Sequence, residues 1–333
     1  MPRYFTAREL DSLRRLRSTF VSFEEHVGEG EPYWESPADL ALYDETFAQR
    51  IGWKWDGVLE ELVRRKRLPA GDTLLDWGCG TGIATRRFLA RGGDVRRVFL
   101  FDHDHAAAEF ALARVRAEHP RVEARVGLPE EAPDVLLVSH VLDELDPEQK
   151  ESLLVLAERS AAVVWCEPGS RRTSRALGEV RARLGQTLDV LAPCTHQATC
   201  GALAGTDAWC HLFARAPQAV YVEGRWAELG RELGIDLRSL PYSFLALARR
   251  GSVATPGSGD LAGPGARLLA RPRLTRGRAE FTLCDADGVR GVDYLQRSDK
   301  QLFKALDDVS GEPWLFDATL EGTRLKALVR RDV

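Results

Sequence analysis

The sequence predicts an α/β protein built on a mainly parallel, doubly wound sheet, followed by a smaller β unit. Short apolar segments alternate with helix-like segments between residues 71 and 250, as in sheets whose strands are buried on both faces and joined by crossover helices. A glycine-rich stretch stands between the first of these strands and the next helix. A segment rich in Gly, Ser, Ala and Pro then separates this region from the C-terminal residues.

Composition indicates a folded protein. Of the 333 residues, 44% are hydrophobic and 29% are charged, which is far from the composition of disordered chains. No apolar run approaches the roughly 18–20 residues that cross a bilayer, and the N-terminus lacks the apolar core of a signal peptide. We therefore expect no membrane association and a cytoplasmic location, where the six cysteines would bind metal or serve catalysis rather than form disulfides.

Residues 1–70 are predicted to be a helical N-terminal region. Apolar residues recur at helical spacing in "TARELDSLRRLRSTF" and in "WDGVLEELVRRKRL". The second segment ends at Pro69-Ala70-Gly71, which is a helix-stop signal.

Residues 71–250 are predicted to form a Rossmann-like, seven-stranded sheet. The first, second, fourth and fifth strands are in "DTLLDWG", "RRVFLFDHD", "DVLLVSHVL" and "AAVVWCEPG", with the third near "VEARVGLPEE". A strand, a helix and a strand in "WCHLFAR", "RWAELGRELG" and "YSFLALARR" complete the sheet. A cysteine-rich segment, 191–211, is interpreted as an insertion near its end.

The glycine-rich stretch predicts a ligand-binding loop. The first strand ends at Asp76, and Gly78, Gly80 and Gly82 lead into a helix, so that the backbone can turn tightly and approach a ligand. Asp102 ends the second strand, where an acid reaches a ribose diol. Because Asp76 would repel a diphosphate and attract a cation, it favours a cationic ligand over a dinucleotide.

The loop sequence "DWGCGTG" resembles motif I of class I S-adenosylmethionine-dependent methyltransferases. That resemblance implies a loop around the amino-acid part of S-adenosylmethionine. The alternative is a fold that keeps the shape without the ligand. Methyl transfer requires mainly alignment of the acceptor with the activated methyl group.

The segment after the fourth strand, "SHVLDEL", holds the candidate catalytic residues His140, Asp143 and Glu144. They are placed to line a substrate pocket, although the two acids also suit a solvated helix start. The segment is not an N-P-P-Y motif. The Pro193-Cys194 pair lies too far beyond the fourth strand to be the expected nucleophile.

The segment "LAPCTHQATCGALAGTDAWCH" contains Cys194, Cys200 and Cys210. Their C-x5-C-x9-C spacing is not that of a zinc ribbon, so a fourth metal ligand must come from elsewhere. The candidates for it are Cys166, Cys284, His196 and His211.

A second unit, 266–333, is predicted to be a small β domain. Residues 251–265 have the composition of a flexible linker. The segment "RAEFTLCDADGVRGVDYLQRS" alternates on both sides of an Asp-Gly turn, as β-hairpins do. We expect a small OB-like barrel.

Over roughly residues 70–310, the chain resembles the methyltransferase-like proteins of the mitochondrial small ribosomal subunit and their bacterial relatives. The resemblance rests, in chain order, on "SHVLDEL", "CEPGS", "APCTHQATC", "WCHLF", "PYSFLALAR" and "RPRL…FTLCDADG". It implies a [4Fe–4S] cluster held by Cys194, Cys200, Cys210 and Cys284. Four thiolates also suit zinc, which remains the alternative metal.

Two arginine-rich stretches predict contacts with RNA phosphates. They contain Arg171, Arg172 and Arg175 in one stretch, and Arg271, Arg273, Arg276 and Arg278 in the other. The second stretch has no acid among its arginines. The alternative is an ordinary solvated surface.

The resemblance implies a protein that acts on the small ribosomal subunit and its 16S rRNA, and we expect it to be monomeric off the ribosome. It would be either an rRNA methyltransferase or an assembly factor whose methyltransferase site is vestigial. The alternative function is a methyltransferase of a small molecule or protein, with a purely structural metal site.

Overall fold

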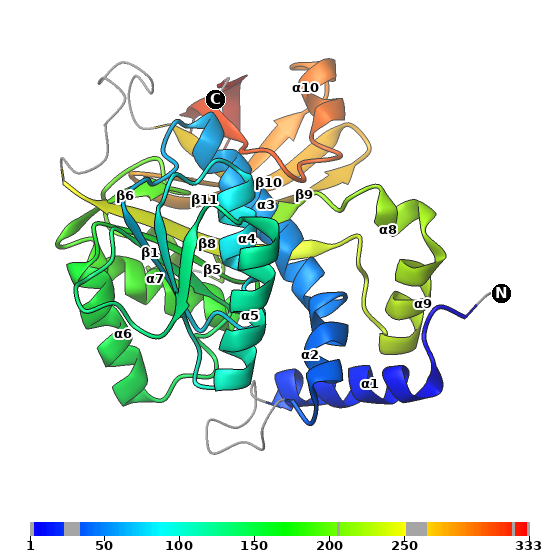
Figure 1. Cartoon of the computed structure of the whole chain (residues 1–333). Helices are drawn as coiled ribbons and strands as arrows, with labels where there is room; N and C mark the ends of the chain where they lie inside the picture. The colour runs from blue at the N-terminus through cyan, green and yellow to red at the C-terminus, as the bar shows by residue number, and fades with distance from the viewer. Residues whose placement is uncertain (1–2, 23–33, 205–206, 251–264, 322–323, 332–333) are drawn as a thin grey trace.

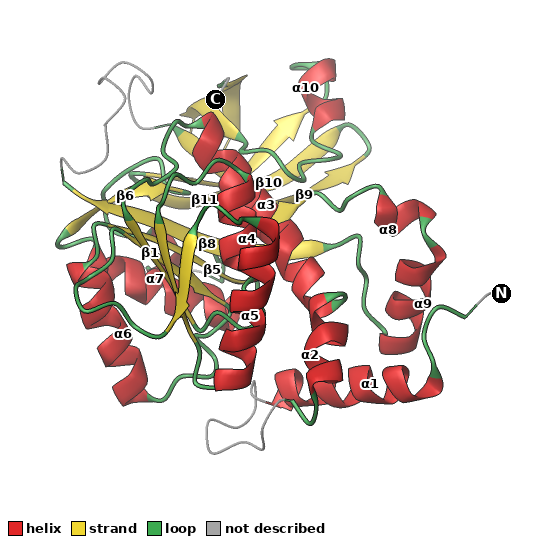
Figure 2. Cartoon of the chain, viewed as in Figure 1, coloured by secondary structure: helices red, strands yellow, loops and turns green. Residues whose placement is uncertain are grey.

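Eight strands from the first 250 residues form one mixed sheet (Figures 1 and 2). The structure, a computed structural model, describes residues 3–22, 34–204, 207–250, 265–321 and 324–331. The predicted linker therefore lies outside the described residues except for Gly265. The strands are β1 (Thr73–Trp77), β2 (Arg97–Phe101), β3 (Glu123–Val126), β4 (Val135–Ser139), β5 (Ala162–Pro168), β6 (Leu188–Ala192), β7 (Leu212–Ala214) and β8 (Leu240–Arg249).

The strand order is β3-β2-β1-β4-β5-β8-β6, and β7 also pairs with β8. The first five strands are parallel, while β8 runs antiparallel to β5, β6 and β7. Without β7, this is the order of the class I methyltransferase fold, and that part of the predicted fold class is confirmed. The order reverses between β1 and β4, which is where ligands of such sheets bind.

The predicted strand count is wrong, because the sheet has eight strands and not seven. Residues 188–192 form β6, which overlaps the start of the predicted insertion at residue 191. The segment "WCHLFAR" supplies only the three-residue β7 at the end of β8. The short β6 lies directly after a helix and a turn, and its local sequence gave too weak a signal to separate it from the cysteine-rich segment.

Helices cover both faces of the sheet (Figure 1). Side chains alternate along a strand, so consecutive residues of β1 point to opposite faces. Leu74 and Leu75 are both fully buried but belong to different apolar cores, which means that both faces are covered. Trp55 and Phe88 are in one core, and Trp165 is in the other. The helices are α1 (Ala7–Ser22), α2 (Pro37–Asp44), α3 (Phe47–Arg64), α4 (Ile83–Ala90), α5 (His105–Glu118), α6 (Pro147–Arg159), α7 (Arg171–Leu184), α8 (Ala219–Val222) and α9 (Gly224–Leu233).

Helix caps fix where the site loops end. The Asp104 side chain accepts from two backbone N–H groups at the start of α5, and Asp146 forms a capping box with Gln149 at the start of α6. Ser170 caps α7. Each cap supplies an acceptor for N–H groups that have no partner within the helix.

The strands of residues 266–330 close into a barrel with the order β10-β11-β13-β12-β9. They are β9 (Ala266–Thr275), β10 (Arg278–Asp285), β11 (Gly288–Leu295), β12 (Leu315–Glu321) and β13 (Arg324–Arg330), with α10 (Lys300–Ala305) between β11 and β12. Phe281, Tyr294 and Phe316 are among the residues of its separate apolar core. Strands β11 and β13 are parallel, whereas the other neighbours are antiparallel.

A buried ion triad attaches the barrel to the sheet unit. The Glu61 carboxylate on α3 accepts from both Nη atoms of Arg267 on β9, at 2.6 and 2.7 Å, and from Arg65 at 3.0 Å. All three side chains are at most 4% exposed. Because removal of one partner leaves a buried charge uncompensated, such a group strongly resists being broken.

The same two arginines hold the cysteine-rich segment. Arg267 donates to the Pro193 carbonyl at 3.0 Å, and Arg65 donates to the Cys194 carbonyl at 3.2 Å. Thr195 also donates its hydroxyl to the Gly265 carbonyl. The helical region, the insertion and the barrel therefore meet at one buried point.

Within the part of the chain that the structure describes, no helix has both the length and the apolar character to cross a membrane.

We expect Glu61→Gln to lower the free energy of unfolding by about 3 kcal/mol, because it leaves two buried guanidinium groups without their counterion. Urea denaturation measures this. The matched control is Glu123→Gln, which breaks an exposed pair with Arg125 and should cost less than about 1 kcal/mol. Equal effects of the two changes would contradict the role given to the triad.

Candidate functional site

The glycine-rich loop lies at the carboxyl ends of β1 and β2. The N–H groups of Gly78 and Cys79 donate to the Phe101 carbonyl at 2.8 and 3.0 Å, which fixes the loop against β2. Gly78, Gly80 and Gly82 have φ values of +69°, +50° and +76°. These values lie in the left-handed region, which glycine adopts without steric cost.

The three glycines differ in what surrounds them. A Cβ atom on Gly78 would stand 2.7 Å from Val141, and one on Gly82 would stand 3.0 Å from Ala111. A Cβ on Gly80 would meet nothing within 4 Å. Gly78 and Gly82 are therefore needed for packing, while the space above Gly80 is open to a ligand.

Asp76 is fully buried beneath this loop. Its Oδ2 accepts from the Thr85 hydroxyl at 2.7 Å and from the Thr85 N–H at 3.3 Å. Its Oδ1 has no hydrogen-bond partner in the described structure, and burial raises the pKa of this carboxyl to about 6. Asp76 thus anchors the start of α4 with one oxygen and keeps the other for a donor.

Asp102 holds the other side of the loop. Its Oδ2 accepts from the Gly80 N–H at 2.8 Å, and its Oδ1 accepts from the Asp104 N–H at 3.0 Å. Its side chain is 10% exposed, and burial raises its pKa. The structure therefore brings the predicted cofactor residues of the two strands together at one point.

His140 directly follows β4 and has the unusual φ of +57°. Its Nε2 lies 3.0 Å from Lys54 Nζ on α3, and its Nδ1 lies 3.3 Å from the Ser139 hydroxyl. Trp55 donates to that same hydroxyl at 2.9 Å. Left-handed backbone in a residue other than glycine is costly and is frequent at functional sites.

Both groups of this pair have altered proton affinities. Burial, and then the neighbouring Lys54 ammonium, lowers the pKa of His140 well below its usual value. Burial lowers the pKa of Lys54 to about 7. Because burial disfavours the charged form of both groups, the imidazole is neutral near neutral pH and the amine titrates there.

The two predicted acids lie apart from this pair. Asp143 accepts from Arg172 of α7 at 3.0 Å. Glu144 and Asp102 both add to the effect of burial in raising the pKa of Tyr43, so Glu144 lies toward the cofactor loop. His140, Asp143 and Glu144 therefore face three different groups of neighbours.

Glu167, which the sequence analysis missed, holds the segment after β4. Its Oε1 accepts from the N–H groups of Val141 and Leu142, both at 3.2 Å, and from Trp165 Nε1 at 2.7 Å. Oε2 has no partner among the described residues, and burial raises the pKa to about 8. The group is therefore largely protonated near pH 7.

Lys54 was missed as well. Two signals were available in the sequence. Lys54 falls on the apolar side of α3, among Trp53, Trp55 and Val58, and Glu167 ends the apolar run of β5. A charged residue inside an apolar pattern is unusual unless it has a partner.

The four cysteines that the resemblance assigns to metal come together. Cys194 follows β6, Cys200 precedes the short 3-10 helix η1 (Gly201–Leu203), Cys210 precedes β7, and Cys284 lies on β10. Burial raises the pKa of Cys200, Cys210 and Cys284, and charge on Cys194 raises all three further. By contrast, Cys166 is fully buried near Lys54 and Glu167.

Backbone contact between the two units sets this arrangement. A Cβ on Gly201 would lie 2.7 Å from Gly288 Cα and 2.8 Å from Val289 N. Val289 pairs with Cys284 across β10 and β11, and Arg267 pairs with Cys284 from β9. The close approach at Gly201 therefore brings Cys200 to the hairpin that carries Cys284.

Arg181 on α7 is the side chain that contacts a thiol. Its Nε donates to Cys194 Sγ at 3.2 Å, and its Nη2 donates to the carbonyls of His196 and Ala198. A cavity of about 30 Å³ lies beside Arg181 and the first three cysteines of the set. Among the described residues, no group of three or more His, Cys, Asp or Glu side chains is arranged to hold a single metal ion.

The first arginine stretch lies on α7, and its side chains form ion pairs and a hydrogen bond within the protein. Arg171 pairs with Asp207 at 2.9 Å, Arg172 with Asp143 at 3.0 Å, and Arg175 donates to the Ala202 carbonyl at 3.1 Å. Arg171 is the most exposed member measured, at 54%. Arg171 and Arg175 therefore contact the cysteine-rich segment, whereas Arg172 contacts the segment after β4.

The second stretch does not stay free of acids in space, which corrects the sequence-based interpretation. Glu280 and Asp293 of β10 and β11 pair with Arg278 at 3.3 and 2.8 Å, and Glu280 lies 3.9 Å from Arg273. Glu280 lies on β10, which pairs with β9, and Asp293 lies on β11, which pairs with β10, so both acids stand outside the linear stretch. Arg271 instead lies over the Phe213 ring at 4.0 Å, and Arg276 is exposed at a turn.

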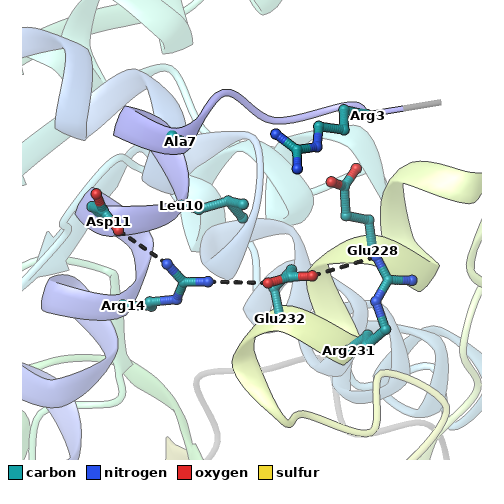
Figure 3. Close-up of a pocket in the computed structure, with 8 residues that line it drawn as sticks. All are labelled: Arg3, Ala7, Leu10, Asp11, Arg14, Glu228, Arg231 and Glu232. Atoms are coloured by element: carbon teal, nitrogen blue, oxygen red, sulfur yellow. Dashed lines mark hydrogen bonds and ion pairs between the residues drawn. The ribbon is translucent and has the colours of Figure 1, made fainter. Parts of the chain in front are cut away.

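A hollow of about 380 Å³ lies between α1 and α9, well away from the loop (Figure 3). Figure 3 shows Arg14 between Asp11 and Glu232, with both ion pairs at 3.0 Å. Its walls are acids and arginines that largely neutralise one another, so it offers no selective charge to a ligand.

A sequence model of a protein family, described as "Mitochondrial small ribosomal subunit Rsm22", matches residues 71–313. The match covers well over half of the chain and spans the sheet unit, the cysteine-rich segment and most of the barrel.

Curated relatives include the ribosomal protein L11 methyltransferases of Burkholderia mallei and Burkholderia pseudomallei. Each is 32% identical over 146 residues, which are 39% of this chain and 45% of the relative. The chain thus spans less than half the length of these relatives.

Similar solved structures include magnesium protoporphyrin IX methyltransferase from Synechocystis PCC 6803, at 14% identity and a TM-score of 0.38, over 74% of this chain and 96% of that one. An O-methyltransferase family protein from Burkholderia thailandensis matches at 13% identity and a TM-score of 0.38, over 48% and 57%. Similarity of this degree says nothing about ligand or activity.

We expect Glu167→Gln to remove a pH dependence of stability. The pKa of this carboxyl is about 8 in the folded state, against an ordinary value of 4.5. Between these pH values the folded state binds more protons than the unfolded state, so the wild type loses stability as pH rises from 4.5 to 8. The loss is at most about 5 kcal/mol. Urea denaturation from pH 4.5 to 8 should show that the free energy of unfolding falls less in the variant than in the wild type. The exposed control Glu130→Gln should show the same fall as the wild type.

Proposed function

Since the chain belongs to the Rsm22 family of the mitochondrial small ribosomal subunit, we propose that it binds S-adenosylmethionine and methylates RNA of the small ribosomal subunit. The observation that supports the proposed cofactor is the open space over Gly80, at the carboxyl end of β1. Membership of the family supports the proposed ribosomal partner.

The residues of the loop fit S-adenosylmethionine. A bound molecule can approach the backbone at Gly80, where a side chain would fill the space. Asp102 is the proposed partner of the ribose diol, and the unpartnered Oδ1 of Asp76 can accept from the cationic amino-acid part, directly or through water. The cofactor supplies a methyl group that is already activated, so the protein needs to align an acceptor with it.

His140 and Lys54 are proposed to manage the proton of that acceptor. An amine or hydroxyl that gains a methyl group releases a proton, and the neutral form of the Lys54 amine, whose pKa is about 7, can take it. His140 positions Lys54 through its Nε2. Glu167 fixes the segment after His140 through the N–H groups of Val141 and Leu142. Asp143 and Glu144 remain proposed lining residues of the acceptor site.

The thiol region fits the proposed [4Fe–4S] cluster in its donor chemistry. Thiolates are the ligands of iron–sulfur clusters and also of structural zinc, and either centre with four thiolates carries net negative charge. Beside it, the buried Arg65 and Arg267 pair with Glu61, while the buried Arg181 contacts Cys194. These four side chains carry more positive than negative charge. Cys194, Cys200, Cys210 and Cys284 are the proposed ligands, and the centre would join the barrel to the sheet unit.

The barrel supports an RNA partner. Its circular order, with β11 beside β13 in parallel, is that of OB folds, which bind oligonucleotides. Arg271, Arg273 and Arg276 lie on its exposed side. Arginine on a barrel surface is suited to phosphate contacts.

A protein acceptor is the second candidate function. The curated relatives are named for the methylation of ribosomal protein L11, and the match covers 39% of this chain. Labelled S-adenosylmethionine with 30S subunits, naked 16S rRNA or ribosomal protein L11 separates the two. Label in RNA supports the first proposal, label in protein supports the second, and binding to 30S subunits without label identifies an assembly factor.

Gly80→Ala should abolish S-adenosylmethionine binding, because its methyl group enters the open space at φ +50°. The left-handed backbone also costs about 1–2 kcal/mol of stability. The matched control is Gly92→Ala, whose φ is +89° and whose Cβ would also meet nothing within 4 Å. Calorimetry should show binding by the control and none by Gly80→Ala, and equal binding would contradict the placement of the cofactor.

Cys284→Ser should remove the metal centre and loosen the barrel, whereas Cys166→Ser should leave both in place. Iron, sulfide and zinc contents of anaerobically purified protein, with its visible absorbance, report the centre. Limited proteolysis reports the barrel. Retention of metal by Cys284→Ser would mean that Cys284 is not the fourth ligand.

A further inference from the structure

A row of ring side chains lies on the extended segment that leads into β7. Trp209 and His211 stack with their centroids 4.8 Å apart at 17°, and His211 meets Phe213 edge-on at 5.5 Å. These alternate residues are all half-buried and share one side of the segment. Arg215, the next alternate residue, is 64% exposed.

Arg271 of the barrel completes this row. Its guanidinium lies over the Phe213 ring, with Cζ 4.0 Å from the centroid, and the residue is exposed. The neighbouring Ala270 donates its N–H to the His211 carbonyl at 3.0 Å. The aromatic row and the arginine are therefore held together across the junction of the sheet and the barrel.

The surroundings of the row carry exposed positive charge. Arg273 follows Arg271 on the outward side of β9 and is 80% exposed, and Arg238 is 68% exposed. The charge on Arg271 also lowers the pKa of Asp236, after the effects of Arg238, which places Arg271 and Arg238 around the same acid. Phosphates of a nucleic acid strand that crossed this junction would meet several arginines.

We propose that this row, defined by Trp209, His211, Phe213 and Arg271, is a stacking surface for the bases of single-stranded RNA. Unpaired bases stack on aromatic rings and on guanidinium planes, and Phe213 holds the guanidinium of Arg271 in place. The bases of a duplex are already stacked and cannot use such a surface. The inference rests on the proposed function only in taking RNA as the partner.

The test compares binding of a single-stranded oligouridine and of an RNA duplex of equal length to the full, anaerobically purified protein. Phe213→Leu keeps an apolar side chain but removes the ring. It should weaken oligouridine binding about tenfold, as expected from stacking energies of about 1–3 kcal/mol per base, and leave duplex binding unchanged. Arg271→Met, a surface change, should weaken oligouridine binding as well.

Arg225→Met is the matched control. Arg225 lies 5.4 Å from the Phe5 ring centroid and 5.6 Å from that of Trp226, both buried, and its loss should not alter either affinity. Ultraviolet crosslinking of oligouridine should label the peptide that contains residues 209–213.

Two outcomes would overturn the inference. Oligouridine binding that is unchanged in both Phe213→Leu and Arg271→Met, with crosslinks elsewhere, would reject the stacking surface while leaving the RNA partner in place. Failure of the wild type to bind any RNA or 30S subunits would reject the RNA partner itself. The stacking surface would also be rejected if the wild type bound no RNA but captured a protein, and if both Phe213→Leu and Arg271→Met lost that capture.

Discussion

The buried carboxylate of Glu61 is the interaction on which the arrangement of the molecule depends. It neutralises Arg65 at the end of its own helix and Arg267 from the barrel. Arg65 also donates to the Cys194 carbonyl, and Arg267 to the Pro193 carbonyl. A group of this kind adds little net stability compared with an apolar core, but it is satisfied in one geometry only. It therefore fixes the barrel, α3 and the cysteine-rich segment relative to one another.

Helix α3 connects this junction to the proposed methyl-transfer site. Lys54 and Glu61 are seven residues apart, about two turns, and so lie on one side of the helix. Lys54 contacts His140 after β4, while Glu61 holds the barrel. Displacement of the barrel that strained α3 would thus shift Lys54 against His140, and α3 supports both the proposed metal site and the proposed methyl-transfer site.

Local patterns predicted the part of the structure that depends on local sequence. The strands and the glycine loop were recognisable because a buried strand, Asp76 and the glycines follow one another in the chain. The partners of Lys54, Glu167 and Arg267 were not, because each contact joins residues far apart in sequence and a lone charged residue does not name its partner. The acids beside Arg273 and Arg278 were missed for the same reason, since the pairing of β9, β10 and β11 brings them there.

The extended segment before β7 carries both a thiol of the proposed metal site and rings of the proposed stacking row, because its side chains alternate. Cys210 faces the other thiols, whose charges raise its pKa in addition to burial, and Ser243 donates to its carbonyl. The residues on either side of it, Trp209 and His211, stack on one another and belong to the proposed stacking row, and Trp209 also lines the cavity beside the thiols. Ordering of the thiols by a metal would therefore order the row, because a strand cannot move one side without the other. On this geometry the proposed metal centre would support the proposed RNA binding without taking part in the proposed methyl transfer.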